Sequence, residues 1–196
     1  MLETTHLRPH FDELSEKKWS VLTIDADLSL KLQQNAMQRL AKGQFRDAEL
    51  AATQKVVSTI RNDKIFWLDA SLQSLDSTEH EFLQFLETFK NELKQNLRVS
   101  LIEVECHYAH YAAGHFYKRH RDITPIENKR IFSFVLYLNP NWQPQDGGEL
   151  VCYEANETLF QVKPELGRFI LFRSDLEHEV KVTQRDRLSL AGWFRC

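Results

Sequence analysis

The segment Tyr111–Asp122, with the sequence YAAGHFYKRHRD, decides how the rest of this chain is interpreted. It contains a His-x-Asp pair, His120 and Asp122. If the pair lies on or near a strand, side chains two residues apart point to the same side, and the imidazole and the carboxylate converge on one point. One such pair is a weak signal, because the chain has 8 histidines and the two side chains could simply lie on the surface.

His178 is a third candidate ligand, in the segment Ser174–Val180, where a turn leads into a strand-like stretch. Two histidines and one carboxylate form the facial triad of non-haem iron(II) oxygenases, which leaves one face of the metal open. We therefore expect His120, Asp122 and His178 to be the catalytic metal ligands. These residue types favour iron(II) but do not exclude zinc or manganese.

Arg187 follows a turn expected over Thr183–Asp186, so a hairpin would bring it back beside the strand that carries His178. A dicarboxylate cosubstrate bound to the metal through a 2-oxo acid needs a cation for its far carboxylate. The planar guanidinium of arginine can bind that carboxylate with two hydrogen bonds. Arg187 alone could be a solvated surface residue, but beside the triad it predicts a cosubstrate site.

The chain of 196 residues is expected to form a single domain, residues 1–196. Residues up to about 95 have mainly helical patterns, and residues from about 96 have mainly strand patterns. The elements expected in the first part are a helix from Leu28 to Lys42 capped by Asp27, a helix over Arg46 to Val57, a strand from Ile65 to Leu68, and a helix from Glu79 to Gln95 with a capping box between Asp76 and Glu79.

Short stretches rich in β-branched and aromatic residues, separated by turn signals, follow to residue 195. Many short strands of this kind favour a sandwich or barrel, of which the jelly roll is one form, with the earlier helices packed on its outer face. The expected class is mostly β with helices, α+β. The predicted strands are Leu101–Tyr111, Ile131–Leu138, Glu149–Tyr153, Arg168–Phe172, Glu179–Val182 and Leu188–Arg195.

Charge and composition restrict the possible partners. The formal net charge is -3, so no basic excess exists to displace counterions from nucleic acid. The start of the chain is unlike a signal peptide, and no apolar run reaches the roughly 20 residues of a membrane span. Cys106, Cys152 and Cys196 lack the spacing of a metal knuckle and are expected to be reduced thiols, which predicts a cytoplasmic protein.

The segment Tyr111–Asp122 resembles the metal-binding signature of the prolyl 4-hydroxylases, Y-x-x-G-x-x-Y-x-x-H-x-D. Asp146–Leu150, His178–Val180 and Arg187–Ser189 follow in that family's order and spacing. A closer resemblance is to the hypoxia-factor (egl-nine type) prolyl hydroxylases and their bacterial relatives, and it covers roughly residues 59–196. It is carried by RNDKIFW at Arg61–Trp67, by VLYLN at Val135–Asn139, and by Trp193.

This resemblance implies a double-stranded β-helix with buttressing helices and a site that uses Fe(II), 2-oxoglutarate and O2, with ascorbate as a possible reductant. His120, Asp122 and His178 would hold the iron. Arg187, helped by the Tyr137 hydroxyl, would hold the far carboxylate of 2-oxoglutarate, and Tyr111 would lie near its metal end. The substrate would contact Arg130, Arg61 and Trp193.

The implied activity is hydroxylation of a prolyl residue in a regulatory or translation-related protein, with release of succinate and CO2. Three alternatives stay open: the same chemistry on a free amino acid or other small molecule, a nucleic-acid demethylase, and a non-catalytic jelly-roll module that binds a metal. The sequence also departs from the animal enzymes. Gln95–Val99 replaces a long mobile loop, so a lid would be short or would come from Asp69–Asp76. The oligomeric state is not predicted.

Overall fold

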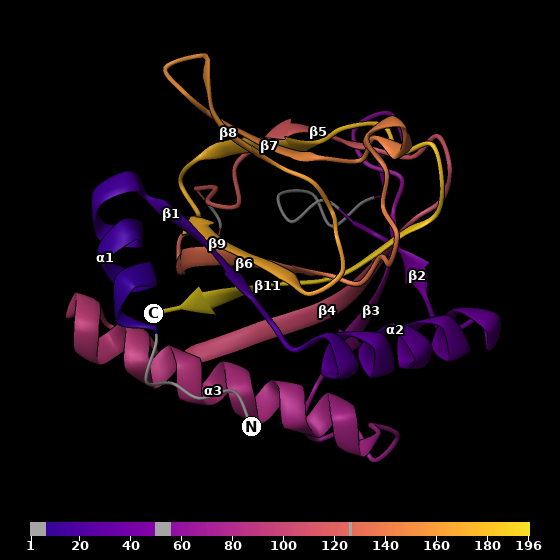
Figure 1. Ribbon diagram of the computed structural model, residues 1–196, viewed down its shortest axis with the longest axis horizontal. Helices are drawn as coiled ribbons and strands as arrows, with labels where there is room; N and C mark the ends of the chain where they lie inside the picture. Colours follow the sequence, from indigo (N-terminus) through magenta and orange to yellow (C-terminus); the bar gives the residue numbers. More distant parts are fainter. Residues whose placement is uncertain (1–6, 50–55, 126) are drawn as a thin grey trace.

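The computed structural model describes residues 7–49, 56–125 and 127–196, which form two stacked antiparallel sheets with helices on one outer face (Figure 1). The larger sheet has seven strands in the order β1-β9-β6-β11-β4-β3-β2, and the smaller has four in the order β5-β10-β7-β8. This arrangement confirms the expected class, a mostly β jelly roll buttressed by helices. The larger sheet consists of β1 (Trp19–Thr23), β2 (Arg46–Asp47), β3 (Lys64–Leu68), β4 (Glu103–Tyr111), β6 (Arg130–Tyr137), β9 (Arg168–Arg173) and β11 (Arg187–Arg195). The smaller consists of β5 (Tyr117–His120), β7 (Leu150–Glu154), β8 (Glu157–Val162) and β10 (Glu177–Val180).

The helices α1 (Arg8–Lys17), α2 (Ala26–Ala41) and α3 (Ser77–Leu97) lie against the face of the larger sheet that points away from the smaller one (Figure 1). The longest, α3, begins at the predicted capping box, in which Asp76 accepts from the first-turn backbone and Glu79 accepts from the Asp76 N–H. The sequence predicts an apolar stripe at helical spacing along it, of which Phe82, Leu86, Phe89 and Leu93 are fully buried and Phe85 is half-buried. This helix therefore forms because its cap satisfies free N–H groups while one face packs on the sheet.

Alternation along β6 separates two hydrophobic cores. Phe134 and Leu136 point into the core beneath the helices, whereas Val135 and Tyr137 point into the core between the sheets. Successive side chains of a strand point to opposite faces, so one strand can serve both cores. The face that points between the sheets is the one that builds the site.

A buried ion pair joins α2 to α3. Arg39 donates from Nε to Glu79 Oε1 at 2.7 Å and from Nη2 to Glu79 Oε2 at 2.5 Å. The Glu79 side chain is completely buried, and it also caps the backbone of α3. Because removing one partner would leave a buried charge uncompensated, the pair fixes how the two helices pack together.

Two helix predictions need correction. The α2 helix is capped by Asp25, whose side chain accepts from the Leu28 N–H at 3.0 Å, and not by Asp27. The helix predicted over Arg46–Val57 is wrong for the described residues, because 46–47 form the edge strand β2 and pair with β3. There the hydrogen bonds of the sheet edge outweigh local helix propensity. Residues 50–55 of that prediction lie outside the described residues.

The prediction that residues 1–95 are mainly helical is incomplete, because this part of the chain also contains the strands β1, β2 and β3. The elements α1, β1, β5 and β8 were not predicted, and β1, β2 and β3 all belong to the larger sheet. Within the described residues, no helix has both the length and the apolar character needed to cross a lipid bilayer.

Candidate active site

The three predicted metal ligands lie together between the sheets. His120 ends β5 and pairs across the strands with His178 of β10, and the two ring centres are 4.2 Å apart. Asp122 follows β5, with Oδ1 at 3.7 Å from His120 Nε2 and Oδ2 at 3.6 Å from His178 Nε2. Their ligand atoms all lie within 4.8 Å of one another. The cross-strand pair of His120 and His178 and the carboxylate of Asp122, two residues after His120, thus converge on one point.

Each imidazole is oriented by a main-chain carbonyl two residues before it. The Nδ1 of His120 lies 2.7 Å from the Lys118 carbonyl oxygen, and the Nδ1 of His178 lies 3.0 Å from that of Leu176. Donation from Nδ1 to a carbonyl leaves the Nε2 lone pair free, as a metal ligand requires. Burial, followed by the proximity of His178, lowers the pKa of His120 to about 3, so its ring is neutral at physiological pH.

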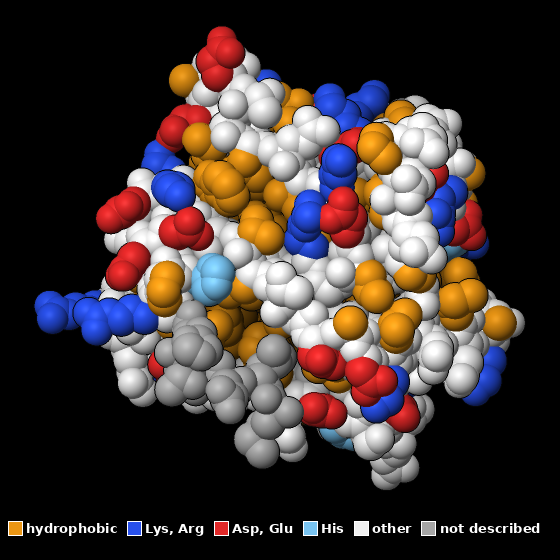
Figure 2. Space-filling view, in the orientation of Figure 1, with side chains coloured by type: hydrophobic (Ala, Val, Ile, Leu, Met, Phe, Trp, Pro, Cys, Tyr) orange, Lys and Arg blue, Asp and Glu red, His pale blue; other side chains and the backbone are white. Residues whose placement is uncertain are grey.

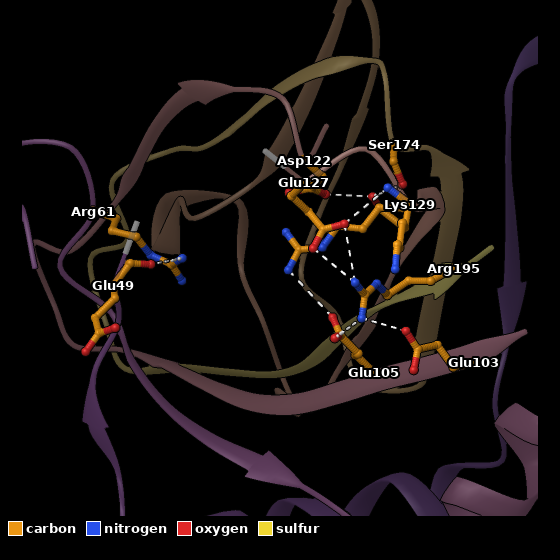
Figure 3. A network of polar contacts seen from close by, with 11 residues as sticks. Glu49, Arg61, Glu103, Glu105, Asp122, Glu127, Lys129, Ser174 and Arg195 are labelled. Carbon is orange, nitrogen blue, oxygen red and sulfur yellow. Dashed lines mark hydrogen bonds and ion pairs between the residues drawn. The ribbon is translucent and has the colours of Figure 1, made fainter. Parts of the chain in front are cut away.

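Asp122 is held by a chain of two hydroxyls. Ser133 of β6 donates to Asp122 Oδ2 at 2.6 Å, and the Ser133 and Ser174 hydroxyls lie 2.8 Å apart (Figure 3). Burial would raise the pKa of Asp122, but the two imidazoles and the Ser133 hydrogen bond lower it, and it lies at about 2. The carboxylate is therefore ionised and fixed in direction before any metal binds.

The Tyr117 ring covers one face of the His120 ring. The two rings are stacked with centres 3.5 Å apart, and the Arg61 guanidinium lies 4.3 Å from the centre of the Tyr117 ring. Asp63 accepts from Arg61 Nε at 2.7 Å and from Nη2 at 2.6 Å. Arg61, predicted to contact substrate, does line the cavity, but its guanidinium is held by Asp63 and lies against the Tyr117 ring, which stacks on the candidate ligand His120.

Arg187 lines the same cavity and is 1% exposed. It donates from Nε to the Gly148 carbonyl at 3.0 Å, and its guanidinium carbon lies 4.9 Å from the Tyr111 ring centre and 5.1 Å from that of Tyr137. Among the residues that the structure describes, no carboxylate pairs with it, and the buried Tyr137 hydroxyl has no hydrogen-bond partner. A buried cation and a buried hydroxyl without an acceptor together fit one end of an anionic ligand.

Aromatic side chains form the opposite wall of the cavity, whose volume is about 490 Å³. His107 of β4 packs between Trp67 and Trp193, with ring centres 4.7 Å and 5.4 Å away. The Arg130 guanidinium carbon lies 3.5 Å from the Trp193 ring centre. Arg130 and Trp193, both predicted to contact substrate, thus lie against each other at the cavity.

A cluster of opposite charges borders this wall. Figure 3 shows Arg195 among three carboxylates: it pairs with Glu103 at 2.7 Å, with Glu127 at 3.1 Å, and also with Glu105. Glu105 in turn lies 3.6 Å from Arg130. Because Glu127 belongs to the segment that joins Asp122 to β6 and lines the cavity, the cluster fixes this part of the rim.

The comparisons agree with this geometry. Residues 106–195 match the family model described as the 2OG-Fe(II) oxygenase superfamily. A crystal structure of a Pseudomonas putida prolyl-4-hydroxylase is 36% identical, covering 97% of this chain and 99% of that one, with a TM-score of 0.88. The chain belongs to the 2OG-Fe(II) oxygenases and is of the prolyl 4-hydroxylase type.

Two further relatives match very different shares of this chain and of their own length. A Trichoplax adhaerens prolyl hydroxylase, solved in complex with a hypoxia inducible factor peptide fragment, is 25% identical over 99% of this chain and 94% of that one, with a TM-score of 0.83. An uncharacterized Fowlpox virus protein is 34% identical over 83 residues, which are 41% of this chain and 18% of the viral protein. The oxygenase therefore matches only a small part of the viral protein.

Fe(II), 2-oxoglutarate and O2 are the cofactors of the oxygenase, and its residues fit them. Two Nε2 atoms and one carboxylate suit iron(II), and the unpaired Arg187 with the Tyr137 hydroxyl suits a dicarboxylate. When bound, these groups supply the oxidising power needed to hydroxylate an unactivated C–H bond. A non-catalytic metal-binding module is therefore excluded, because the chain is an enzyme of this family.

Sequence reasoning missed Ser133. It could have been found from strand alternation, because it faces the same side as Tyr137 four residues later on β6. Three histidines close to the triad in sequence, His107, His110 and His115, are predicted to be pocket-wall or surface residues, and of these His107 lines the cavity. His110 instead lies 3.3 Å from Asp186.

The lid predicted at Asp69–Asp76 is not found there, since no residue of this segment lines the cavity. Leu75 is buried in the core beneath the sheet, and the Ser74 carbonyl accepts from Arg39 at 2.8 Å. The segment instead fills the approach to α3, because its apolar and carbonyl groups have partners on the helical side of the sheet.

Proposed function

We propose that this oxygenase hydroxylates a prolyl residue within a protein or peptide and releases succinate and CO2. The observation that carries the proposal is the set of groups that line one cavity: a buried Arg187 without a carboxylate partner in the described chain, the triad, and the wall of Trp67, His107 and Trp193. The likeness to the P. putida and Trichoplax prolyl hydroxylases over almost the whole chain supports it, and the second of these holds a peptide.

Each predicted residue has a role in this proposal. His120, Asp122 and His178 hold the iron. Arg187 and the Tyr137 hydroxyl bind the far carboxylate of 2-oxoglutarate. Tyr111, predicted near the metal end of the cosubstrate, lies with its ring beside Arg187 and lines the space between that end and the triad. The substrate residue then lies against the aromatic wall. Arg130 and Trp193 contact it, and Arg61 acts indirectly through Tyr117.

Free proline or another small molecule is the competing substrate class. A panel of proline-containing peptides, tested beside free proline, separates the two when succinate release and the gain of one oxygen atom are both measured. We expect oxygen to be added to a peptide and not to free proline. The His178→Ala variant is the control, and we expect it to form no substrate-dependent succinate. Turnover of free proline alone would contradict the proposal.

The partner is proposed to be a regulatory or translation-related protein in the cytoplasm. Cys106, Cys152 and Cys196 are all free thiols, which suits a reducing compartment. A nucleic-acid substrate is not favoured, because on the face shown in Figure 2 Lys and Arg side chains are interspersed with Asp and Glu and form no basic patch. Comparing proteins from cells with and without this gene should reveal a hydroxyproline that depends on it.

A further inference from the structure

His107 is a buried imidazole that does not belong to the candidate metal ligands. It is 4% exposed, lines the cavity, and packs between the rings of Trp67 and Trp193. In the described part of the chain its Nδ1 is buried without a hydrogen-bond partner. Phe or Leu would pack equally well against two indoles, so packing does not explain a polar ring here.

The position of the ring proton follows from this burial. An enclosed N–H without an acceptor is less tolerable than an enclosed lone pair without a donor, so the proton belongs on Nε2. Burial, then Arg61 and Arg130, lowers the pKa of His107 to about 3, so the ring is neutral. His107 therefore brings one N–H to the cavity wall, on the side of the ring that is not enclosed.

Neighbouring groups of the same wall are also donors. Trp193 Nε1 and Arg130 Nε are both buried, and the indole faces the Asp122 carboxylate, whose pKa it helps to lower, whereas Arg130 Nε has no partner within the described ranges. An indole N–H and a guanidinium N–H can only donate, and the carboxylates beside this wall, Glu105 and Glu127, already pair with Arg195, so within the described chain the wall presents more donors than free acceptors. A ligand that completes it must carry acceptors and few donors of its own.

A prolyl residue within a peptide has this character. Its nitrogen has no hydrogen, and the carbonyl groups before and after the ring only accept. Free proline differs, since its ammonium group would bring two donors and a positive charge beside Arg130 and Arg61. Resting on the proposed prolyl hydroxylation, we propose that His107 is a substrate-binding residue whose N–H donates to a main-chain carbonyl next to the target proline.

Two variants separate this hydrogen bond from packing. His107→Phe keeps the aromatic contact with both indoles and removes the donor, whereas His107→Gln keeps a donor and loses the stack. For a prolyl peptide that wild type hydroxylates, we expect kcat/KM to fall about tenfold or more in His107→Phe and less in His107→Gln. The KM for 2-oxoglutarate and the Tm should stay unchanged. If His107 had only a structural role, at least one of these two quantities would change as well.

Changing the substrate completes the test. In two peptides, a thioamide replaces the carbonyl before or after the proline, which weakens that acceptor. At least one of them should be a poorer substrate for wild type than the parent peptide, and the loss should disappear in His107→Phe. An unaltered kcat/KM in His107→Phe, or two thioamides that react like the parent with wild type, would overturn the role of His107 alone. A wild type that hydroxylates no prolyl peptide would overturn the proposed function itself.

Discussion

Tyr117 lies flat against the metal-ligand candidate His120, with ring centres 3.5 Å apart and ring planes inclined by 13°. Arg61 covers the opposite face of the Tyr117 ring, and Asp63 fixes Arg61 with two hydrogen bonds. A column of four side chains thus begins next to β3 and ends at the metal site. It restricts the His120 ring to one plane, so its outermost members should influence metal affinity without touching the metal.

This column predicts a graded response to substitution at Tyr117. Replacement by Ala removes the surface that keeps His120 in plane, and we expect the affinity for Mn(II) or Co(II) to fall about tenfold. Tyr117→Phe retains the stacked ring and should bind the metal like wild type. Calorimetric titration of the metal-free protein measures both. Equal losses in the two variants would show that the hydroxyl, and not the stack, is what matters.

Ser133 should affect the metal through Asp122. Ser133→Ala removes the hydrogen bond that fixes Oδ2, and loss of such a partner typically lowers metal affinity about 10- to 100-fold. Ser174→Ala acts one hydroxyl further away and should cost less. The same titration serves, with Tm recorded as a check on folding. A larger effect at Ser174 than at Ser133 would contradict the relay.

Arg187 should control the cosubstrate and not the metal. Arg187→Gln removes the charge proposed to bind the far carboxylate of 2-oxoglutarate. We expect the KM for 2-oxoglutarate to rise at least about tenfold, since hydrogen bonds to charged groups are worth about 1.5–3 kcal/mol. Metal affinity should be unchanged. Arg185→Gln is the matched control, because Arg185 pairs with Asp146 in a more exposed position. A normal KM in Arg187→Gln would place the cosubstrate elsewhere.

The buried pair between α2 and α3 predicts a stability effect remote from the site. Glu79→Ala leaves Arg39 uncompensated and removes half of the capping box, so the free energy of unfolding should fall by about 3–5 kcal/mol in urea titrations. Glu87→Ala breaks an ion pair in which the carboxylate is 54% exposed and should cost under about 1 kcal/mol. The double variant Arg39→Met with Glu79→Met should lose less than Glu79→Ala. A double variant less stable than the single one would mean that the charges themselves stabilise the packing.

Local chemistry made parts of the fold predictable. The capping box at Asp76 and Glu79 and the apolar stripe of α3 are local patterns, and the structure contains both. Arg187 reaches the cavity that His178 enters, but the hairpin predicted between them is wrong, because β10 pairs with β5 and β7 in the smaller sheet and β11 pairs with β4 and β6 in the larger one. Patterns that lie within a few turns of one helix carry their own geometry, whereas the choice of sheet depends on distant strands.

Long-range pairing made other parts unpredictable. The helix expected from Arg46 is a strand because β3 offers it hydrogen bonds, and β1 becomes a strand because it pairs with β9, far along the chain. His107 looked like any histidine, and only the approach of Trp67 and Trp193 from neighbouring strands gives it an enclosed position. Such environments depend on partners that no local window contains.

The position of β11 has a consequence for how the protein is made. This strand comes after every other strand in chain order, yet it lies at the centre of the larger sheet between β6 and β4. A chain still emerging from the ribosome cannot join the two halves of that sheet until residues 187–195 are outside, and contacts this distant in sequence form slowly. Because the same strand begins with Arg187, the cavity is completed only when the sheet is. 2-Oxoglutarate, for which Arg187 is the proposed partner, is therefore expected to bind a finished fold and not a nascent one.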